Sequence, residues 1–248
     1  QPMLAERDDA HEVRTASYGS DDIVQVLATK FLVTGFFTPD YAPLAMAFSK
    51  NLSEHGISHH FYARQRIEGR AQTLQKPSVL LNAMADHPDA VLIVMDVDCT
   101  VRGDISELSR SDADVALRLK PKNFRGRFLL MPCARVVAIK PNAGGKAFAE
   151  SWEDSCRRHR CDEQALIGVL GDTRFYFSIT GISPKYMGAE SRDAAADAVI
   201  VHDSAADAKR TGWAARKLVQ QQFFATREKV SILLTGKSYD SWRSKLQE

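Results

Sequence analysis

The sequence predicts an α/β protein in which a mostly parallel central sheet is flanked by helices. Apolar runs of strand length alternate with segments whose apolar residues recur every three or four positions. One run, residues 91–95, is apolar on both faces, as expected for a strand in the middle of a parallel sheet covered by helices. We expect residues 23–248 to form a single domain and the polar residues 1–22 to form an N-terminal arm.

The first half of the chain contains three predicted strands and two predicted helices. The apolar run Phe31–Val33 is closed by Thr34-Gly35, which marks the end of a short strand. Gly56 ends the first amphipathic helix, and Pro77 stands in the first turn of the second, where a missing N–H costs little. The predicted strands are residues 31–33, 59–63 and 91–95, and the predicted helices are residues 40–54 and 77–85.

The second half continues the same alternation. Its predicted strands are residues 115–117, 135–139, 175–179 and 198–201, and its predicted helices are residues 146–156, 162–170 and 213–226. Repeated strand–helix units of this kind indicate one sheet with helices packed against it.

Composition excludes several classes of protein. A formal net charge of +2 gives no support for a nucleic-acid-binding surface. No apolar run approaches the roughly 18–20 residues that a membrane span requires, so we expect no transmembrane segment. The four cysteines include no CxxC pair, which fits a reducing compartment, and we expect a cytoplasmic protein.

The most informative feature is a pair of acids at the end of the apolar strand. Asp96 and Asp98 directly follow residues 91–95, and ligands of open α/β sheets bind outside the carboxyl ends of their strands. Two acids held together repel each other unless a cation lies between them. Mg²⁺ or Mn²⁺ accepts such oxygens and often keeps phosphate oxygens as further ligands. The pattern therefore predicts a site for a metal ion and a diphosphate.

The acid pair alone leaves two enzyme classes open. Asp96 to Thr100 fits the DxDxT pattern of haloacid-dehalogenase-like phosphatases, in which Asp96 would be the nucleophile. The same DxD also fits nucleotide-sugar glycosyltransferases of the GT-A fold, in which the pair holds a metal ion on the donor diphosphate.

The residues around the pair resemble family-8-like glycosyltransferases. Val91 to Leu108, VLIVMDVDCTVRGDISEL, is similar to the segment of that family that carries the DxD motif. Four further segments resemble the family in the same order, namely residues 32–41, 135–152, 162–166 and 199–209. The resemblance implies a GT-A fold with a Rossmann-like sheet.

The resemblance also implies roles for individual residues. It assigns Asp98, Asp96 and His202 to a divalent metal ion, with Asp96 sharing the metal or holding the ribose. Asp162 and Glu163 would act at the catalytic centre by binding sugar hydroxyls or positioning the acceptor. The nucleotide-binding residues would be Thr34, Gly35, Phe36, Tyr41, Lys76, Asp96, Val97 and Lys209.

The resemblance predicts a metal-dependent hexosyltransferase that uses Mn²⁺ or Mg²⁺. The donor would be a nucleoside diphosphate sugar, UDP-linked, and the acceptor a hydroxyl of a glycan, a lipid-linked sugar or a small molecule. Resemblance to family 8 points to retention of the anomeric configuration. Glu163 replaces a Gln of the family pattern and Ala205 replaces a Gly. These departures leave a non-catalytic nucleotide-sugar binder open beside the phosphatase.

Overall fold

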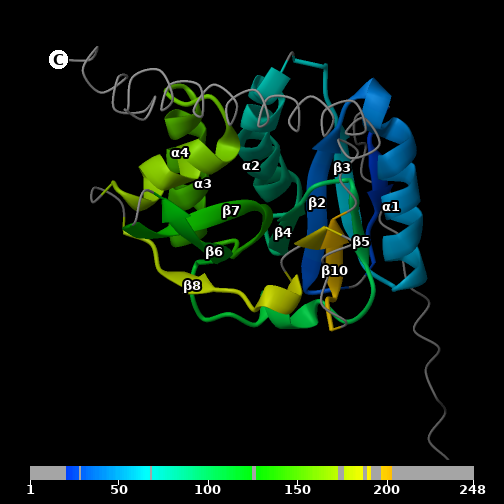
Figure 1. Ribbon diagram of the computed structural model, residues 1–248. Helices are drawn as coiled ribbons and strands as arrows, with labels where there is room; N and C mark the ends of the chain where they lie inside the picture. The colour runs from blue at the N-terminus through cyan, green and yellow to red at the C-terminus, as the bar shows by residue number, and fades with distance from the viewer. Residues whose placement is uncertain are drawn as a thin grey trace, which may run out of the picture. The chain divides into compact units, whose positions relative to one another are not determined.

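A central seven-stranded sheet organises the chain (Figure 1). The computed structural model describes residues 21–27, 29–67, 69–124, 127–172, 176–186, 189–190 and 197–202. All of these belong to one compact unit, residues 1–203; a second unit, residues 204–248, lies outside the described part, and with it the predicted helix 213–226. In spatial order, the strands of the sheet are β1 (Ile23–Gln25), β3 (His59–Ala63), β2 (Phe31–Phe37), β4 (Val91–Met95), β7 (Arg127–Ile139), β6 (Val115–Phe124) and β8 (Ile179–Gly181).

The sheet contains parallel and antiparallel pairs. β2 runs parallel to β3 and β4, and β6 runs parallel to β8. The β1–β3, β4–β7 and β6–β7 pairs are antiparallel. The sheet is thus more evenly mixed than the expected mostly parallel one, because β6 and β7 form a hairpin with no helical crossover between them. The predicted α/β class with flanking helices is confirmed.

Helices cover both faces of the sheet. In β4, Leu92 and Val94 join the apolar cluster formed with α2 (Lys76–Asp86), α3 (Ala143–Cys156) and α4 (Asp162–Leu170). Ile93 and Met95 join the cluster on the other face, which includes α1 (Ala42–Glu54). This alternation explains why the strand is apolar throughout. No helix among the described residues is long and apolar enough to span a membrane.

A smaller sheet lies beyond the end of β4. Its strands, in the order β5, β10 and β9, are Cys99–Val101, Ile200–His202 and Ala189–Glu190. β5 begins three residues after the first acid of the DxD pair and runs antiparallel to β10. Short 3₁₀ helices complete the described elements, η1 (Pro39–Tyr41), η2 (Gly69–Gln75), η3 (Ser106–Ser109) and η4 (Pro184–Tyr186).

Local sequence signals explain several helix ends. Asn142 caps α3, where its side-chain oxygen accepts a hydrogen bond from the N–H of Gly145 at 2.8 Å. Pro77 lies in the first turn of α2, as predicted. Gly56 follows α1 with φ of 64°, a left-handed conformation that glycine adopts without steric cost. The strands 59–63 and 91–95 and the helix 162–170 have the predicted bounds.

Other elements differ from the prediction. The strand expected at 31–33 continues to Phe37, and the strands expected at 115–117 and 135–139 extend into the long hairpin. The strand predicted at 175–179 is wrong for its described residues 176–178, and β8 begins only at Ile179. Ser178 instead donates from its N–H and its hydroxyl to Asp114 Oδ2. The side chain of Asp114 thus accepts the backbone hydrogen bond that a neighbouring strand would otherwise accept.

Candidate metal and nucleotide site

The acids of the DxD pair lie in the turn that joins the two sheets. β4 ends at Met95, and Asp96 to Asp98 lead into β5. A Cβ at Gly35 would overlap the carbonyl oxygen of Met95, so glycine in β2 lets the end of β4 approach closely. Because His202 of β10 pairs with Cys99 of β5, the sheet register brings the histidine to the acids.

Asp96, Asp98 and His202 form a group that could hold a metal ion. One ligand atom from each residue lies within 4.8 Å of the others. His202 Nε2 lies 3.0 Å from Asp98 Oδ1 and 3.9 Å from Asp96 Oδ2. The other ring nitrogen, Nδ1, is buried and has no hydrogen-bond partner among the described residues. Two carboxylates and an imidazole suit a divalent cation of the Mn²⁺ type, so the donor set fits the predicted metal.

Lys76 connects this group to a third acid. Its Nζ lies 2.7 Å from Asp96 Oδ1 and 3.0 Å from Asp162 Oδ2, and it donates to the carbonyl oxygen of Ala134 at 3.0 Å. The side chain is only 3% exposed. Burial by itself lowers the pKa of Lys76, but Asp162 and Asp96 outweigh it, and the pKa is raised. Lys76 is therefore a buried cation that holds two carboxylates.

Asp96 remains under electrostatic conflict despite this ion pair. Burial raises the pKa of its carboxyl group, Lys76 opposes that effect, and Asp98 raises the pKa again. The net shift is upward. A cation bound between Asp96 and Asp98 would lower the pKa of Asp96.

Asp162 is fixed by the packing of α4. Its Oδ2 pairs with Lys76, and its Oδ1 accepts from the N–H of Glu163 at 2.9 Å. Its backbone N–H donates to Thr73 Oγ1, and its carbonyl oxygen accepts from Trp152 Nε1, both at 3.2 Å. Asp162 is buried as a result, whereas Glu163, the next residue, is exposed.

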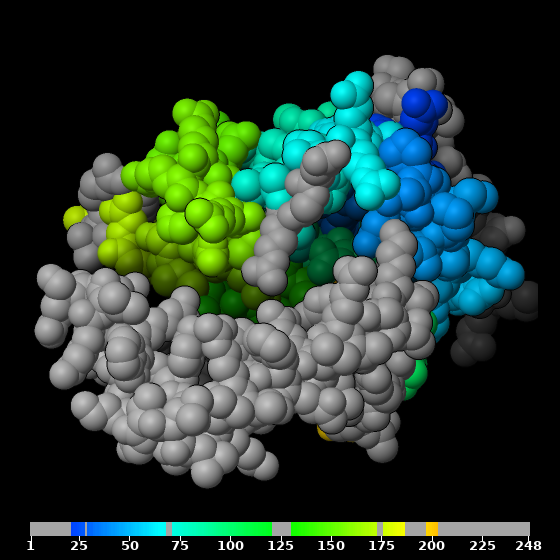
Figure 2. All heavy atoms as spheres, turned by 45° about the horizontal axis from the view of Figure 1, so that its top comes forward, coloured from blue at the N-terminus to red at the C-terminus, as the bar shows by residue number. Residues whose placement is uncertain are grey.

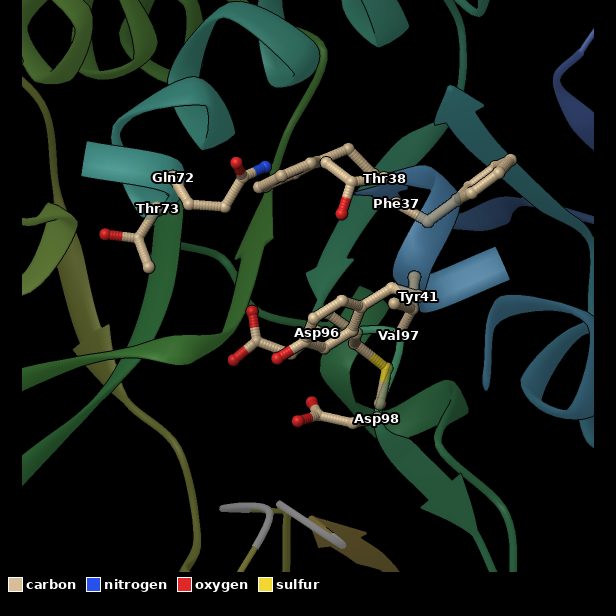
Figure 3. Close-up of a pocket in the computed structure, with 10 residues that line it drawn as sticks. Phe37, Thr38, Tyr41, Gln72, Thr73, Asp96, Val97 and Asp98 are labelled. Atoms are coloured by element: carbon tan, nitrogen blue, oxygen red, sulfur yellow. The ribbon is translucent and has the colours of Figure 1, made fainter. Parts of the chain in front are cut away.

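A pocket opens beside the acid pair (Figure 3). Figure 3 shows the hydroxyl of Tyr41 directed toward the carboxylate of Asp96. Burial raises the pKa of Tyr41, and Asp98, Asp40 and Asp96 raise it further. Figure 2 shows the blue, cyan and light-green segments of the chain around a recessed darker green floor. The pocket is lined by Phe36, Phe37, Thr38, Tyr41, Gln72, Thr73, Met95, Asp96, Val97 and Asp98.

Comparison with solved structures decides the fold. A glycosyltransferase involved in the glycosylation of the major capsid of PBCV-1 matches with a TM-score of 0.54 and 13% identity, covering 73% of this chain and 98% of that one. The chain has the GT-A fold. The galactosyltransferase LgtC, solved with donor and acceptor sugar analogues, matches at a TM-score of 0.44 and 10% identity, over 69% of this chain and 86% of its own.

The glycosyltransferase GlyE of Streptococcus pneumoniae TIGR4 matches at a TM-score of 0.41 and 18% identity, over 64% of this chain and 46% of its own. No protein-family model and no curated protein sequence matches the chain.

Within the GT-A framework, most of the predicted nucleotide residues meet at one place. Phe36, Tyr41, Asp96 and Val97 line the pocket, and Lys76 lies behind Asp96. Lys209 lies outside the described residues.

Two predicted nucleotide residues lie inside the GT-A sheet and do not line the pocket. Thr34 is fully buried, and its hydroxyl donates to the carbonyl oxygen of His60 at 3.0 Å. Gly35 is buried against Met95. Both belong to β2, which continues past the point where the sequence predicted a loop.

Sequence reasoning missed five of the pocket residues, namely Phe37, Thr38, Gln72, Thr73 and Met95. Thr38 ends the segment after β2, and Gln72 and Thr73 belong to η2. A short 3₁₀ helix has no apolar periodicity, so nothing in the sequence around Gln72 indicated a binding wall. Lys76, which was singled out, lies in the same stretch at the first residue of α2.

Proposed function

We propose that this chain is a metal-dependent glycosyltransferase that moves a hexosyl group from a UDP-linked sugar to an acceptor hydroxyl. One observation carries the proposal. In a chain with the GT-A fold, Asp96, Asp98 and His202 converge at the carboxyl end of β4, beside a pocket that has aromatic walls.

Asp96, Asp98 and His202 would hold the Mn²⁺ or Mg²⁺ ion. A divalent cation supplies Lewis acidity, which stabilises the negative charge that grows on the leaving diphosphate as the glycosidic bond breaks. The raised pKa of Asp96 supports the assignment, because a cation bound between the two acids would relieve their repulsion. His202 Nε2, which lies 3.0 Å from Asp98 Oδ1, is the ring nitrogen placed to reach that cation.

The remaining residues bind and orient the substrates. Phe36 and Tyr41 offer aromatic faces for the base, and Val97 lies in the pocket wall between the two acids. Lys76 holds Asp96 and Asp162 in fixed orientations, so that little rearrangement is needed during transfer. Glu163, exposed at the start of α4, and Lys209 keep their predicted roles toward the acceptor and the diphosphate.

The resemblance to family 8 supports retention of the anomeric configuration. All four cysteines are free thiols, which supports activity in the reducing cytoplasm. The acceptor would be a hydroxyl of a glycan, a lipid-linked sugar or a small molecule.

Replacing one ligand tests the proposal. Asp98→Asn keeps the shape of the side chain and removes its charge, and we expect the Mn²⁺-dependent affinity for UDP to fall more than about 100-fold in calorimetry. Asp89→Asn is the matched control, because Asp89 is exposed and does not line the pocket. An unchanged affinity in Asp98→Asn would contradict the metal assignment.

Turnover separates the alternatives. Slow Mn²⁺-dependent hydrolysis of a UDP-sugar by the wild-type protein would support an enzyme over a non-catalytic binder. Release of phosphate from a generic aryl phosphate, lost in Asp96→Asn, would favour the phosphatase instead.

A further inference from the structure

Gln72 carries an amide group that is only half satisfied. Its Oε1 accepts a hydrogen bond from the backbone N–H of Ile67 at 2.6 Å. Because an N–H can bond only to the oxygen, this contact fixes which way the amide points. The other end, Nε2, is buried and has no hydrogen-bond partner among the described residues. A buried donor in that state is unfavourable, typically by about 1–3 kcal/mol, so it calls for a ligand.

The free amide nitrogen belongs to the wall of the pocket that contains the DxD acids. Figure 3 shows it turned toward Thr38. Thr38 is only 3% exposed, and its hydroxyl donates to Asp40 Oδ1 at 2.7 Å. The proton of this hydroxyl is therefore committed, and the lone pairs of its oxygen remain to accept. The wall thus offers one hydrogen-bond donor and one acceptor.

The two ends of the pocket differ in charge. Asp96 and Asp98 form the acidic end, where the proposed function places the metal ion and the diphosphate. Gln72 and Thr38 are uncharged and share the pocket with the rings of Phe36 and Tyr41. Neutral hydrogen-bonding groups beside aromatic rings suit a nucleobase, whose faces stack and whose edge carries donors and acceptors.

Resting on the proposed function, we infer that Gln72 and Thr38 select the base of the donor nucleotide and favour a keto edge. Uracil presents a carbonyl oxygen beside an N–H, and guanine presents the same pair. Gln72 Nε2 donates to the carbonyl oxygen, and Thr38 Oγ1 accepts from the ring N–H. Cytosine and adenine present an amino group beside a bare ring nitrogen. The Gln72 donor would then face a donor, and the Thr38 acceptor would face an acceptor.

The wild-type protein gives the first test. We expect UDP or GDP to bind with Mn²⁺ at least about 10-fold more tightly than CDP and ADP in calorimetry, the size of discrimination that paired base contacts give. Tighter binding of UDP identifies uracil as the base, and tighter binding of GDP identifies guanine. Tighter binding of CDP or ADP would overturn the inference.

Gln72→Glu gives the sharper test. The variant keeps an oxygen for the Ile67 N–H and replaces the donor by an acceptor. We expect the ratio of UDP affinity to CDP affinity, or of GDP to CDP where guanine is the base, to fall by about 10-fold or more. Since the two nucleotides share the diphosphate, the ratio cancels the effect of the added charge on that group.

The controls distinguish a failure of the proposed function from a failure of the role assigned to Gln72. Gln75→Glu makes the same change in the same 3₁₀ helix, outside the pocket, and should leave the ratio unchanged. A protein that binds no nucleoside diphosphate with Mn²⁺ would refute the proposed function itself. A wild-type preference that survives Gln72→Glu would refute only the role of Gln72. Should that variant fail to melt cooperatively, Thr38→Val is titrated instead, and an unchanged ratio there overturns the inference.

Discussion

Two buried polar clusters lie on the same sheet and behave differently. The acid cluster comprises Lys76, Asp96, Asp98, Asp162 and His202, at the carboxyl end of β4. The histidine cluster comprises the buried His60 of β3 with the residues around it. His60 Nδ1 lies 3.0 Å from His87 Nε2, and His60 Nε2 lies 3.3 Å from Asp22 Oδ2.

The histidine cluster satisfies itself. Both ring nitrogens of His60 are paired, and its ring stacks on Tyr62 with centroids 3.9 Å apart. The hydroxyl of Tyr62 donates to Asp86 Oδ2 at 2.7 Å. None of these residues lines the pocket beside the DxD acids.

The acid cluster does not satisfy itself. Asp96 has a raised pKa in spite of its ion pair with Lys76, and His202 keeps a buried nitrogen with no partner among the described residues. Burial of polar groups alone therefore does not mark a functional site. What distinguishes the acid cluster is the electrostatic imbalance at Asp96, which a cation between the two acids would relieve.

Among single substitutions, removing Lys76 should have the largest effect on stability. Lys76→Met leaves the buried Asp162 and the half-buried Asp96 without their cation, and we expect a loss of about 3–5 kcal/mol in the free energy of unfolding. Urea unfolding measures it. Lys50→Met is the control, because Lys50 is 79% exposed and its pair with Glu54 spans 3.9 Å, so the loss should stay below about 0.5 kcal/mol. A loss below about 1 kcal/mol in Lys76→Met would contradict a buried ion network.

The next largest effect is a pH dependence of the free energy of unfolding that comes from the buried histidines. Burial lowers the pKa of His59, His60 and His87 in the folded state. As the pH falls from 7 toward 5, the unfolded chain takes up protons near the ordinary pKa of about 6.5, while the folded chain resists. The free energy of unfolding therefore decreases as the pH is lowered, by up to about 1.4 kcal/mol per pH unit for each histidine.

Urea unfolding across that pH range, without added metal, measures the slope. His87→Phe should make it shallower, whereas the control His55→Asn, at an exposed position, should not. An unchanged slope in His87→Phe would mean that the histidine cluster accepts protons freely.

The smallest expected effect concerns Tyr62. Tyr62→Phe removes the hydrogen bond to Asp86 and should cost about 1.5 kcal/mol of unfolding free energy, since bonds to charged groups are stronger than neutral ones. We expect the Mn²⁺-dependent affinity for UDP to stay within about 2-fold of the wild-type value, because the histidine cluster does not line the pocket. A larger loss of affinity would show that the clusters are coupled.

The fold could be predicted where the pattern is local. β4 and α4 have the predicted bounds because an apolar run or a helical period is written in consecutive residues. β1, β5 and β9 have two or three residues each, too few to show a period, and they exist through pairing with distant strands. The antiparallel partner of β4 likewise depends on the hairpin that carries β7.

The site follows the same rule. Asp96 and Asp98 were singled out as an acid pair after an apolar strand, and Lys76, Asp162 and His202 through the resemblance to family-8-like glycosyltransferases. The structure brings all five together. Their geometry, with one lysine shared between two acids, could not be predicted because it depends on how α2 and α4 pack. Thr34 and Gly35 look like the end of a strand in the sequence, yet both lie within β2.

In β2, the hydroxyl of Thr34 reaches a neighbouring strand, and Gly35 admits the Met95 carbonyl. Gln72 could not be found from the sequence, because what marks it is the buried Nε2 atom that has no hydrogen-bond partner among the described residues.

The pairing of β10 with β5 sets an order of events during synthesis. His202 is encoded about a hundred residues after the DxD acids, and only the β5–β10 ladder brings it to them. A nascent chain that has left the ribosome as far as β7 has the strands of the main sheet around β4 but lacks the third donor. Synthesis proceeds from the N-terminus, so the three candidate metal ligands cannot come together in a growing polypeptide until β10 has been made.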